Sequence, residues 1–242
     1  MIKQKIKLFL LYIFFSLLII IFVKSFIFEN FQVKNNMMQQ SLIPGDHVLV
    51  TKFTYGYNSN SVIPIFKFLF KDNSLKKKIF YEEPSRSHIV LYIDNQKKYR
   101  MSRVIGKSGD FVKIDEDKLT INNQTINYKL LDRYHVRCKK KKIRKFKYKE
   151  TLFDNSNYVV FLNNNKKNNF EIKVPKNYFL LLNDNRGCMY KNENFNSYLI
   201  KKENIIGRAQ FILFSLDQNL SKIGRLNLFK FFNFTRTFKK LY

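Results

Sequence analysis

The stretch LIPGDHVLVTKF (residues 42–53) contains the pattern that decides the fold class. From His47 to Phe53 the residues follow a period of two, which predicts a β-strand. Runs of the same kind recur at residues 88–93, 111–114, 118–122, 158–162, 178–182 and 209–214. Asp115-Glu116-Asp117, between two of these runs, predicts a short hairpin turn. No stretch after residue 30 combines helical periodicity with caps, so the sequence predicts a mainly β domain.

An apolar segment precedes this domain. Residues 8–23, LFLLYIFFSLLIIIFV, carry no charge, and the apolar stretch continues past Lys24 to Phe28. With a snorkelling Lys24, this length suits a hydrocarbon core of about 30 Å. Lys3, Lys5 and Lys7 place the N-terminus in the cytoplasm by the positive-inside rule.

A cleaved signal peptide is the alternative, but Val23-Lys24-Ser25-Phe26 offers no small-x-small cleavage site. We therefore expect residues 1–28 to form a basic tip and an uncleaved transmembrane anchor. Residues 29–242 are then an extracytoplasmic domain, on the periplasmic side of a bacterial inner membrane.

The composition is strongly basic, with 45 Lys and Arg residues against 18 Asp and Glu residues and a formal net charge of +27. Nucleic-acid binding would explain this balance. An AT-rich, reduced genome explains it better, because Lys, Asn, Ile and Phe are abundant while Gly numbers only 7. Basic runs such as Lys139 to Lys142 also lack the interleaved aromatic residues that stack on bases. We expect no nucleic-acid partner, and an attraction to anionic membrane lipid.

Two segments interrupt the strand pattern. Residues 58–84 are polar and basic around the apolar run IPIFKFLF, and residues 133–169 are rich in Lys and Asn and contain one predicted strand. The second segment is predicted to be an insertion. Cys138 and Cys188 are the only cysteines. Since there is no CxxC pair and His is scarce, we expect two separate thiols, no metal site and no cofactor.

Four ordered blocks resemble the conserved boxes of bacterial type I signal peptidases, the leader peptidases of peptidase family S26. FQVKNNMMQQSLIPGDHVLVTKFTYG (31–56) is similar to FQIPSGSMxPTLxxGDxxLVxKFxYG, and RSHIVLY (86–92) to RGDIVVF. YRMSRVIGKSGD (99–110) is similar to YIKRVVGLPGD. NYFLLLNDNRGCMYKNENF (177–195), followed by NIIGRAQFILFS, resembles QYFMMGDNRDNSxDSRYWG with NLVGRAxFIxxS. The likeness covers most of residues 30–215.

The resemblance implies a membrane-anchored serine endopeptidase with a β-rich catalytic domain behind one N-terminal transmembrane helix. Such enzymes remove signal peptides from exported preproteins at the outer face of the membrane, using a Ser–Lys dyad. The Ser hydroxyl needs a base that takes its proton. A Lys can be that base only where burial lowers its pKa enough to leave it neutral.

Both positions of the dyad are substituted in this chain. Between Phe31 and the motif residues Gly45 and Asp46 the first box matches without a gap, which places Met37 where the family has its nucleophilic Ser. In the third block Arg103, Gly109 and Asp110 fix the register, which places Ser102 where the family has its base Lys. A thioether has no proton to give, and Ser is no general base at neutral pH.

The last block is retained in part. Asp184, Asn185 and Arg186 match the family, whereas the preceding Gly is Asn183. A Ser that orients the Lys corresponds to Met189, and an Asp and an Arg correspond to Lys191 and Glu193, which reverses the charges. Ser87 and His88 replace the Gly and Asp of RGD, and we interpret His88 as structural.

Apolar residues persist where the family lines its shallow substrate groove. These positions are Phe31, Val33, Met38, Leu42 and Met101. Ordinary β-sheet core would need the same residue types, so this interpretation stays open. Asn35 matches a position that assists the oxyanion hole in some members, and its amide offers a similar donor.

Three hypotheses follow. The first is an active signal peptidase in which Ser41 or Ser102 attacks, with Lys52, Lys107 or Lys191 as base. The second is a family member that has lost peptide-bond cleavage, which the double loss of Ser and Lys favours. Such a protein is either the product of a decaying gene in a reduced genome or a protein that still binds exported preproteins or a partner. The third is a basic membrane-tethered binder of nucleic acid or lipid headgroups, which only the charge supports.

Overall fold

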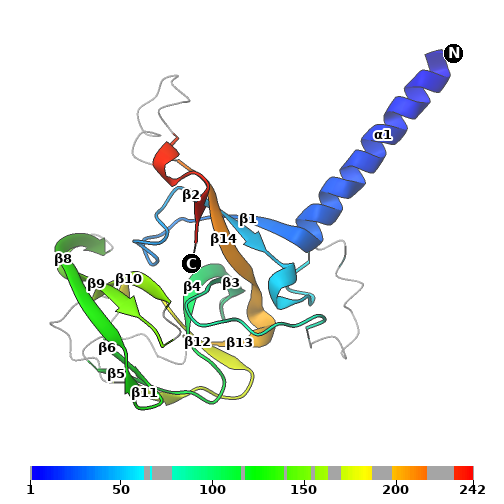
Figure 1. The fold of residues 1–242 in the computed structure, drawn as a ribbon. Helices are drawn as coiled ribbons and strands as arrows, with labels where there is room; N and C mark the ends of the chain where they lie inside the picture. The colour runs from blue at the N-terminus through cyan, green and yellow to red at the C-terminus, as the bar shows by residue number, and fades with distance from the viewer. Residues whose placement is uncertain are drawn as a thin grey trace.

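A long helix projects from a β-rich body in the computed structural model (Figure 1). The structure describes residues 2–62, 66, 78–115, 118–138, 141–153, 156–162, 170–186, 198–216 and 232–241, and all statements below concern these residues. Within them the chain is mainly β, as the alternating runs predict.

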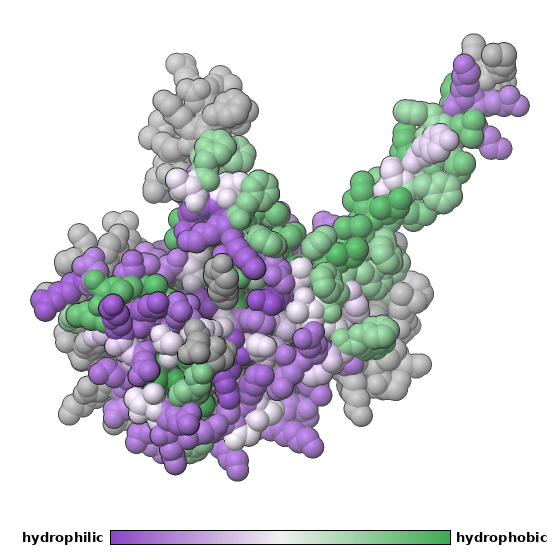
Figure 2. Space-filling model, viewed as in Figure 1, coloured by the Kyte–Doolittle hydropathy of each residue, from purple (hydrophilic) through white to green (hydrophobic). Residues whose placement is uncertain are grey.

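The projecting helix is the predicted anchor. Helix α1 spans Ile2–Phe22 and continues as one π-helical segment, Val23–Ile27. Its surface is apolar along most of its length, in contrast to the mixed surface of the body (Figure 2). The span Gln4–Ile27 is long and apolar enough to cross a membrane. The sequence thus correctly predicted one N-terminal apolar helix that could span a membrane.

The largest sheet has eight strands and curls through the centre of the body. Seven strands follow the order β1-β2-β14-β3-β4-β12-β13, and β15 pairs with β14. Their bounds are β1 Phe28–Gln32, β2 Asp46–Thr51, β3 Ile89–Ile93, β4 Tyr99–Gly106, β12 Tyr178–Leu182, β13 Leu199–Lys201, β14 Ile205–Ser215 and β15 Lys239–Lys240. These strands pair antiparallel with their neighbours in the sheet.

Two smaller sheets complete the body. One has the order β11-β5-β6-β7 and the other β10-β9-β8. Their bounds are β5 Phe111–Asp115, β6 Lys118–Ile121, β7 Gln124–Thr125, β8 Asn127–Cys138, β9 Lys141–Thr151, β10 Asn157–Leu162 and β11 Phe170–Lys173. Short 3-10 segments cover Phe53–Tyr55, Lys202–Asn204 and Phe234–Arg236.

One expectation for the segment 133–169 is wrong. It was expected to hold a single strand, but β8 and β9 run through its Lys-rich part as a long antiparallel hairpin. Lys-rich sequence has low strand propensity, and pairing on both sides of β9 overrides that preference. The predicted hairpin of β5 and β6 is confirmed, although two residues of its turn, 116–117, lie outside the described part of the chain.

The core consists of three apolar clusters. One lies between the two smaller sheets and the end of β4, and includes Leu119, Val160 and Leu180. The other two involve the large sheet. One of them contains Val48, Ile89 and Ile212 together with Val33, Met38 and Leu42 of the loop between β1 and β2. The other includes Tyr55, Val104 and Phe179.

Lys78 is buried beside the second of these large-sheet clusters and gives a pH-dependent prediction. Its amine donates to the carbonyls of Tyr55 (2.9 Å) and Ile205. Burial lowers the pKa of Lys78 from 10.5 to about 7, against an opposing effect of the Glu203 carboxylate. The folded pKa is thus below the unfolded one, and the unfolded state binds the additional proton between these two values.

The free energy of unfolding of the wild type should therefore rise between pH 7 and pH 9 by up to about 1.4 kcal/mol per pH unit from this group alone. Lys78→Met removes the contribution. Urea unfolding at pH 7, 8 and 9 measures it, with Lys118→Met, an exposed lysine, as the control. Parallel curves for the wild type and Lys78→Met would contradict the prediction.

Candidate active site

The loop between β1 and β2 carries the first candidate residues. After β1 the chain is held by hydrogen bonds from Val33 N to Asp46 O (2.8 Å) and from Gly45 N to Val33 O (2.9 Å). Gly45 has a φ of 100°, a conformation that costs glycine little and other residues much. The motif residues Gly45 and Asp46 thus close the loop that presents Met37.

Met37 lies on the segment Asp184-Asn185-Arg186, which follows β12. The backbone N–H of Asn185 donates to Met37 O at 3.0 Å, and the Asn185 amide donates to Asn36 O at 2.8 Å. The Met37 sulfur is 3.8 Å from an Nη of Arg100. The Asn35 side chain accepts from Met37 N at 3.1 Å, so its carbonyl oxygen faces its own loop.

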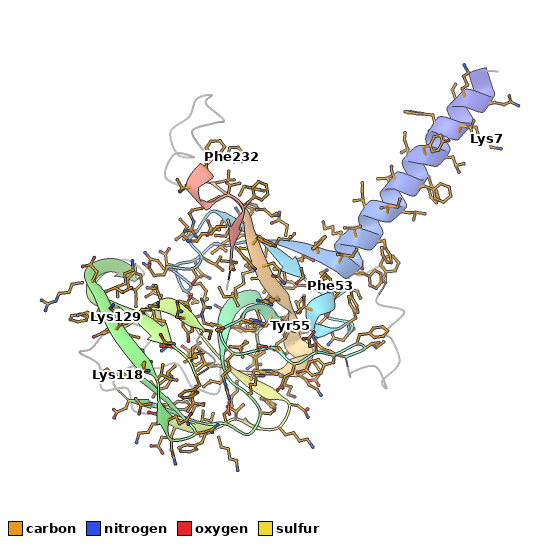
Figure 3. The ribbon with its side chains drawn as sticks, viewed as in Figure 1. Lys7, Phe53, Tyr55, Lys118, Lys129 and Phe232 are labelled. Carbon is orange, nitrogen blue, oxygen red and sulfur yellow. The ribbon has the colours of Figure 1, made fainter. Side chains whose placement is uncertain are left out.

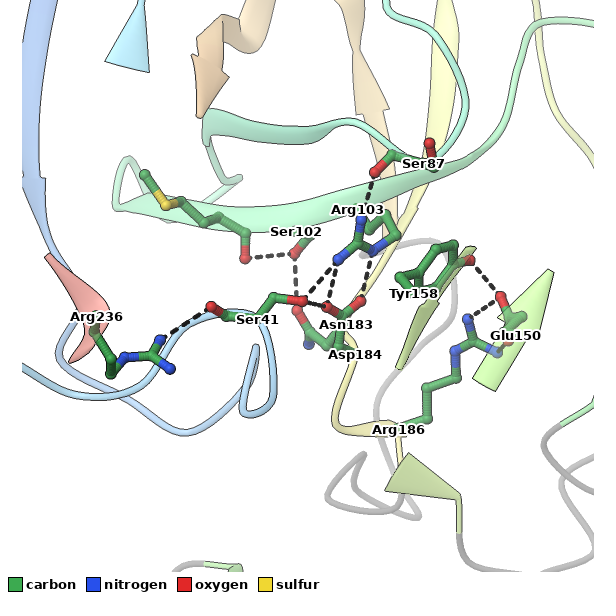
Figure 4. Close-up of polar contacts among 11 residues, drawn as sticks. Ser41, Ser87, Ser102, Arg103, Glu150, Tyr158, Asn183, Asp184, Arg186 and Arg236 are labelled. Atoms are coloured by element: carbon green, nitrogen blue, oxygen red, sulfur yellow. Dashed lines mark hydrogen bonds and ion pairs between the residues drawn. The ribbon is translucent and has the colours of Figure 1, made fainter. Parts of the chain in front are cut away.

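Ser102 lies on β4 and is 2% exposed. Its hydroxyl is 2.8 Å from Oδ1 of Asn183 and 2.9 Å from Met101 O (Figure 4). It is also 3.2 Å from the Tyr92 hydroxyl. The carboxamide of Asn183 thus occupies the space in front of Ser102. The motif resemblance predicts that these are the positions at which type I signal peptidases have Gly and the base Lys.

Ser41 lies against a buried ion pair. Arg103 binds the Asp184 carboxylate through Nε (2.8 Å) and Nη2 (2.7 Å), and both side chains are almost fully buried. The Ser41 hydroxyl donates to Asp184 Oδ2 at 2.5 Å and accepts from Arg103 Nη2 at 2.8 Å. Burial opposes the charge of Arg103, but the Asp184 carboxylate outweighs it and raises the pKa of Arg103.

The chemistry of this cluster follows from its charges. The Ser41 proton faces a carboxylate that is already paired with the Arg103 guanidinium. The two described lysines considered as alternative bases lie elsewhere. Lys52 pairs with Glu29 at 2.8 Å and Lys107 with Glu83 at 3.7 Å. Lys191 is outside the described residues, as are Met189, Glu193, Cys188 and the side chain of Cys138.

A second buried ion pair is linked to the first through Tyr158. Glu150 on β9 binds Arg186 through both oxygens, at 2.6 and 2.8 Å, and accepts from the Tyr158 hydroxyl. The Tyr158 ring lies under the Arg103 guanidinium, 4.0 Å from the ring centroid to Cζ. The hairpin sheet β10-β9-β8 therefore supports the Asp184–Arg186 segment from within the body.

The C-terminal segment reaches the same loop from the other side. The Arg236 guanidinium binds both oxygens of Asp46, at 3.0 and 2.6 Å, and donates to Ser41 O at 3.1 Å. The Asp46 carboxylate is fully buried and also accepts from Ile43 N. Residues 41–46 are thus fixed by a residue that comes near the end of the chain.

The positions predicted to line a groove gather in one apolar cluster. Val33, Met38, Leu42 and Met101 are buried in it, and Phe31 packs against it partly exposed. Leu241, next to β15, belongs to the same cluster. This packing fits sheet core and a shallow groove alike.

The other predicted residues have structural contacts. Asp110 binds Arg86 and accepts from Lys107 N and the Asn122 amide. Burial opposes its charge, but these partners lower the pKa of Asp110. Gly109 has a φ of 89° in the turn between β4 and β5. His88 Nδ1 is 2.8 Å from the Tyr55 hydroxyl.

Four residues at the site were not found from the sequence: Glu150, Tyr158, Asn183 as the partner of Ser102, and Arg236. One signal pointed to the first of these, since Glu150 is the acidic residue that ends a long Lys-rich run. The others are joined to their partners only by contacts between distant parts of the chain.

A single apolar helix that is long enough to cross a membrane, ahead of a curled β-sheet, is the architecture that the resemblance to membrane-anchored, β-rich serine peptidases implies. A family model described as signal peptidase, peptidase S26, matches residues 6–214. The chain belongs to this signal peptidase family.

Similar proteins are found in Rickettsia, each named signal peptidase I. The protein of Rickettsia akari is 30% identical, with 88% of this chain and 82% of the relative covered. That of Rickettsia conorii is 30% identical over 83% of this chain and 77% of the relative. The protein of Rickettsia typhi is 29% identical, with 94% of this chain and 91% of the relative covered.

Proposed function

We propose that this member of the signal peptidase I family binds signal peptides of exported preproteins and is deficient in cleaving them. The observation that carries the proposal is the Ser102–Asn183 pair at the family's base position. A buried hydroxyl bonded to a carboxamide cannot take a proton from a nucleophile. Met37 at the nucleophile position supports the same conclusion.

The anchor and the cluster around the loop support retained binding. Helix α1, with Lys5 and Lys7 near its start, favours a cytoplasmic N-terminus and a body on the outer face of the inner membrane, next to the lipid. The apolar positions Phe31, Val33, Met38, Leu42 and Met101 keep the residue types that small apolar side chains of a signal peptide would contact. Asn35 stays the candidate on the oxyanion side.

Cleavage of a model preprotein by the full-length protein in detergent tests the first half of the proposal. We expect the preprotein to stay intact, because the site lacks both the nucleophile and the base. Processing that is abolished by Ser41→Ala or Ser102→Ala would contradict this and support a displaced nucleophile. Photo-crosslinking of a signal peptide tests binding: Phe31→Ala should weaken the crosslink, whereas Phe234→Ala, an exposed phenylalanine in the C-terminal turn, should not.

A further inference from the structure

The end of the membrane helix is held by side chains of the body. A helix leaves its last carbonyl groups without partners inside the helix. Here the segment after β2 supplies partners for four successive carbonyls. Lys52 Nζ lies 3.1 Å from Lys24 O and 3.3 Å from Ser25 O, the Tyr57 hydroxyl donates to Phe26 O at 2.6 Å, and Lys52 N donates to Ile27 O at 3.0 Å.

The Lys52 ammonium is well suited to this place. It is a cation at the negative end of a helix dipole, where a positive charge is stabilised. Its third partner is the Glu29 carboxylate, at 2.8 Å, on the strand that follows the helix. Three acceptors match the three donors of an ammonium group, which makes a side chain only 2% exposed tolerable.

Ring packing adds to the contact. The Phe26 ring lies 5.7 Å from that of Tyr57, edge to face, and 5.1 Å from that of Phe22. Figure 3 shows Phe53, from the same segment as Lys52 and Tyr57, close below the end of the helix. Residues of the body thus surround the helix end with both polar and aromatic contacts.

The helix passes into the sheet without a linker. The π-helical segment ends at Ile27, β1 begins at Phe28, and Phe28 already pairs with Thr51 on β2. Val33, at the end of β1, opens the loop that carries Met37. The helix end, β1 and the candidate loop are therefore one continuous hydrogen-bonded path.

We propose that Lys52 and Tyr57 are positioning residues that lock the membrane helix to the body. The helix and the body then move as one unit, and the loop at residues 35–41 is held at one height and orientation over the membrane surface. Lys52 and Tyr57 would thereby fix how membrane-bound peptides meet the loop. This proposal does not depend on whether the protein cleaves those peptides.

A distance measurement by pulsed electron paramagnetic resonance tests this with the full-length protein in lipid nanodiscs. Spin labels are attached at Tyr12→Cys, a lipid-facing site on α1, and Lys34→Cys, an exposed site beside the candidate loop, in a chain with Cys138→Ser and Cys188→Ser. The chain with Lys52 and Tyr57 intact should give one narrow distance distribution.

Lys52→Met removes the charge at similar side-chain length, and Tyr57→Phe removes one hydroxyl while the ring contact with Phe26 persists. Each is expected to lose the narrow peak and give a broad distribution. The matched control Lys113→Met removes an exposed lysine paired with Glu171 and should leave the peak unchanged. If Lys52→Met does not fold, Tyr57→Phe decides. A narrow peak retained in the folded variants, or a broad one with both residues intact, would overturn the proposal.

Discussion

Preprotein cleavage is expected to appear when Met37→Ser, Ser102→Lys and Asn183→Gly are combined in one chain. The first two substitutions place a nucleophile and a base at the positions that the resemblance to the family's motifs implies for them. The third is required by the structure, because the Asn183 carboxamide lies 2.8 Å from the Ser102 hydroxyl and fills the space that a lysine side chain would enter. At a position only 2% exposed, desolvation would lower the pKa of the new amine, as a lysine base requires.

The expected gain is large. Loss of the nucleophile or the base of a serine protease costs on the order of 10⁶-fold in kcat, so the triple variant should exceed the background by several orders of magnitude. The double variant that keeps Asn183 should be much weaker, and Met37→Ala with Ser102→Lys and Asn183→Gly should be inactive. A triple variant that folds with unchanged unfolding temperature and does not cleave would show that more than the dyad is lost.

Glu150→Gln is expected to lower the free energy of unfolding by about 3–5 kcal/mol, the usual cost of leaving one charge of a buried pair without its partner. Glu150 is fully buried, and it is the carboxylate that compensates the Arg186 guanidinium and accepts from Tyr158. The substitution should also disturb the candidate site, because Arg186 directly follows Asn185, whose backbone N–H donates to Met37 O.

The matched experiment adds Arg186→Met to Glu150→Gln. Removing both charges leaves no buried ion, so the double variant should recover most of the stability lost in the single one. Urea unfolding of the solubilised protein measures all three chains, with Lys149→Gln, the neighbour on β9, as control. A loss below about 1 kcal/mol in the single variant, the range of exposed ion pairs, would show that the Glu150–Arg186 pair does not support the fold.

Much of this protein follows from its sequence alone. The apolar helix and four of the eight strands of the large sheet, β2, β3, β12 and β14, were predicted from local patterns, namely an unbroken apolar run and a period of two. The strands β1, β4, β13 and β15 were not predicted, and the assignment of Met37 and Ser102 to the dyad positions stays a prediction from ungapped motifs. Side-chain periodicity reports directly which face of a strand is buried, and it needs no knowledge of the partner strand. The hairpin of β8 and β9 was not predicted from the sequence, because its many lysines are typical of solvent-exposed segments with low strand propensity. Pairing between the two strands determines its conformation.

The tertiary structure alone decided the contacts between distant parts of the chain. Asn183 meets Ser102 across 81 positions and Arg236 meets Asp46 across 190. Glu150 meets Arg186, and Lys52 meets the end of the membrane helix, in the same way. In each case a buried polar group requires a partner, but the residue types near it in sequence do not say which one. Only the closure of the sheets brings these pairs together.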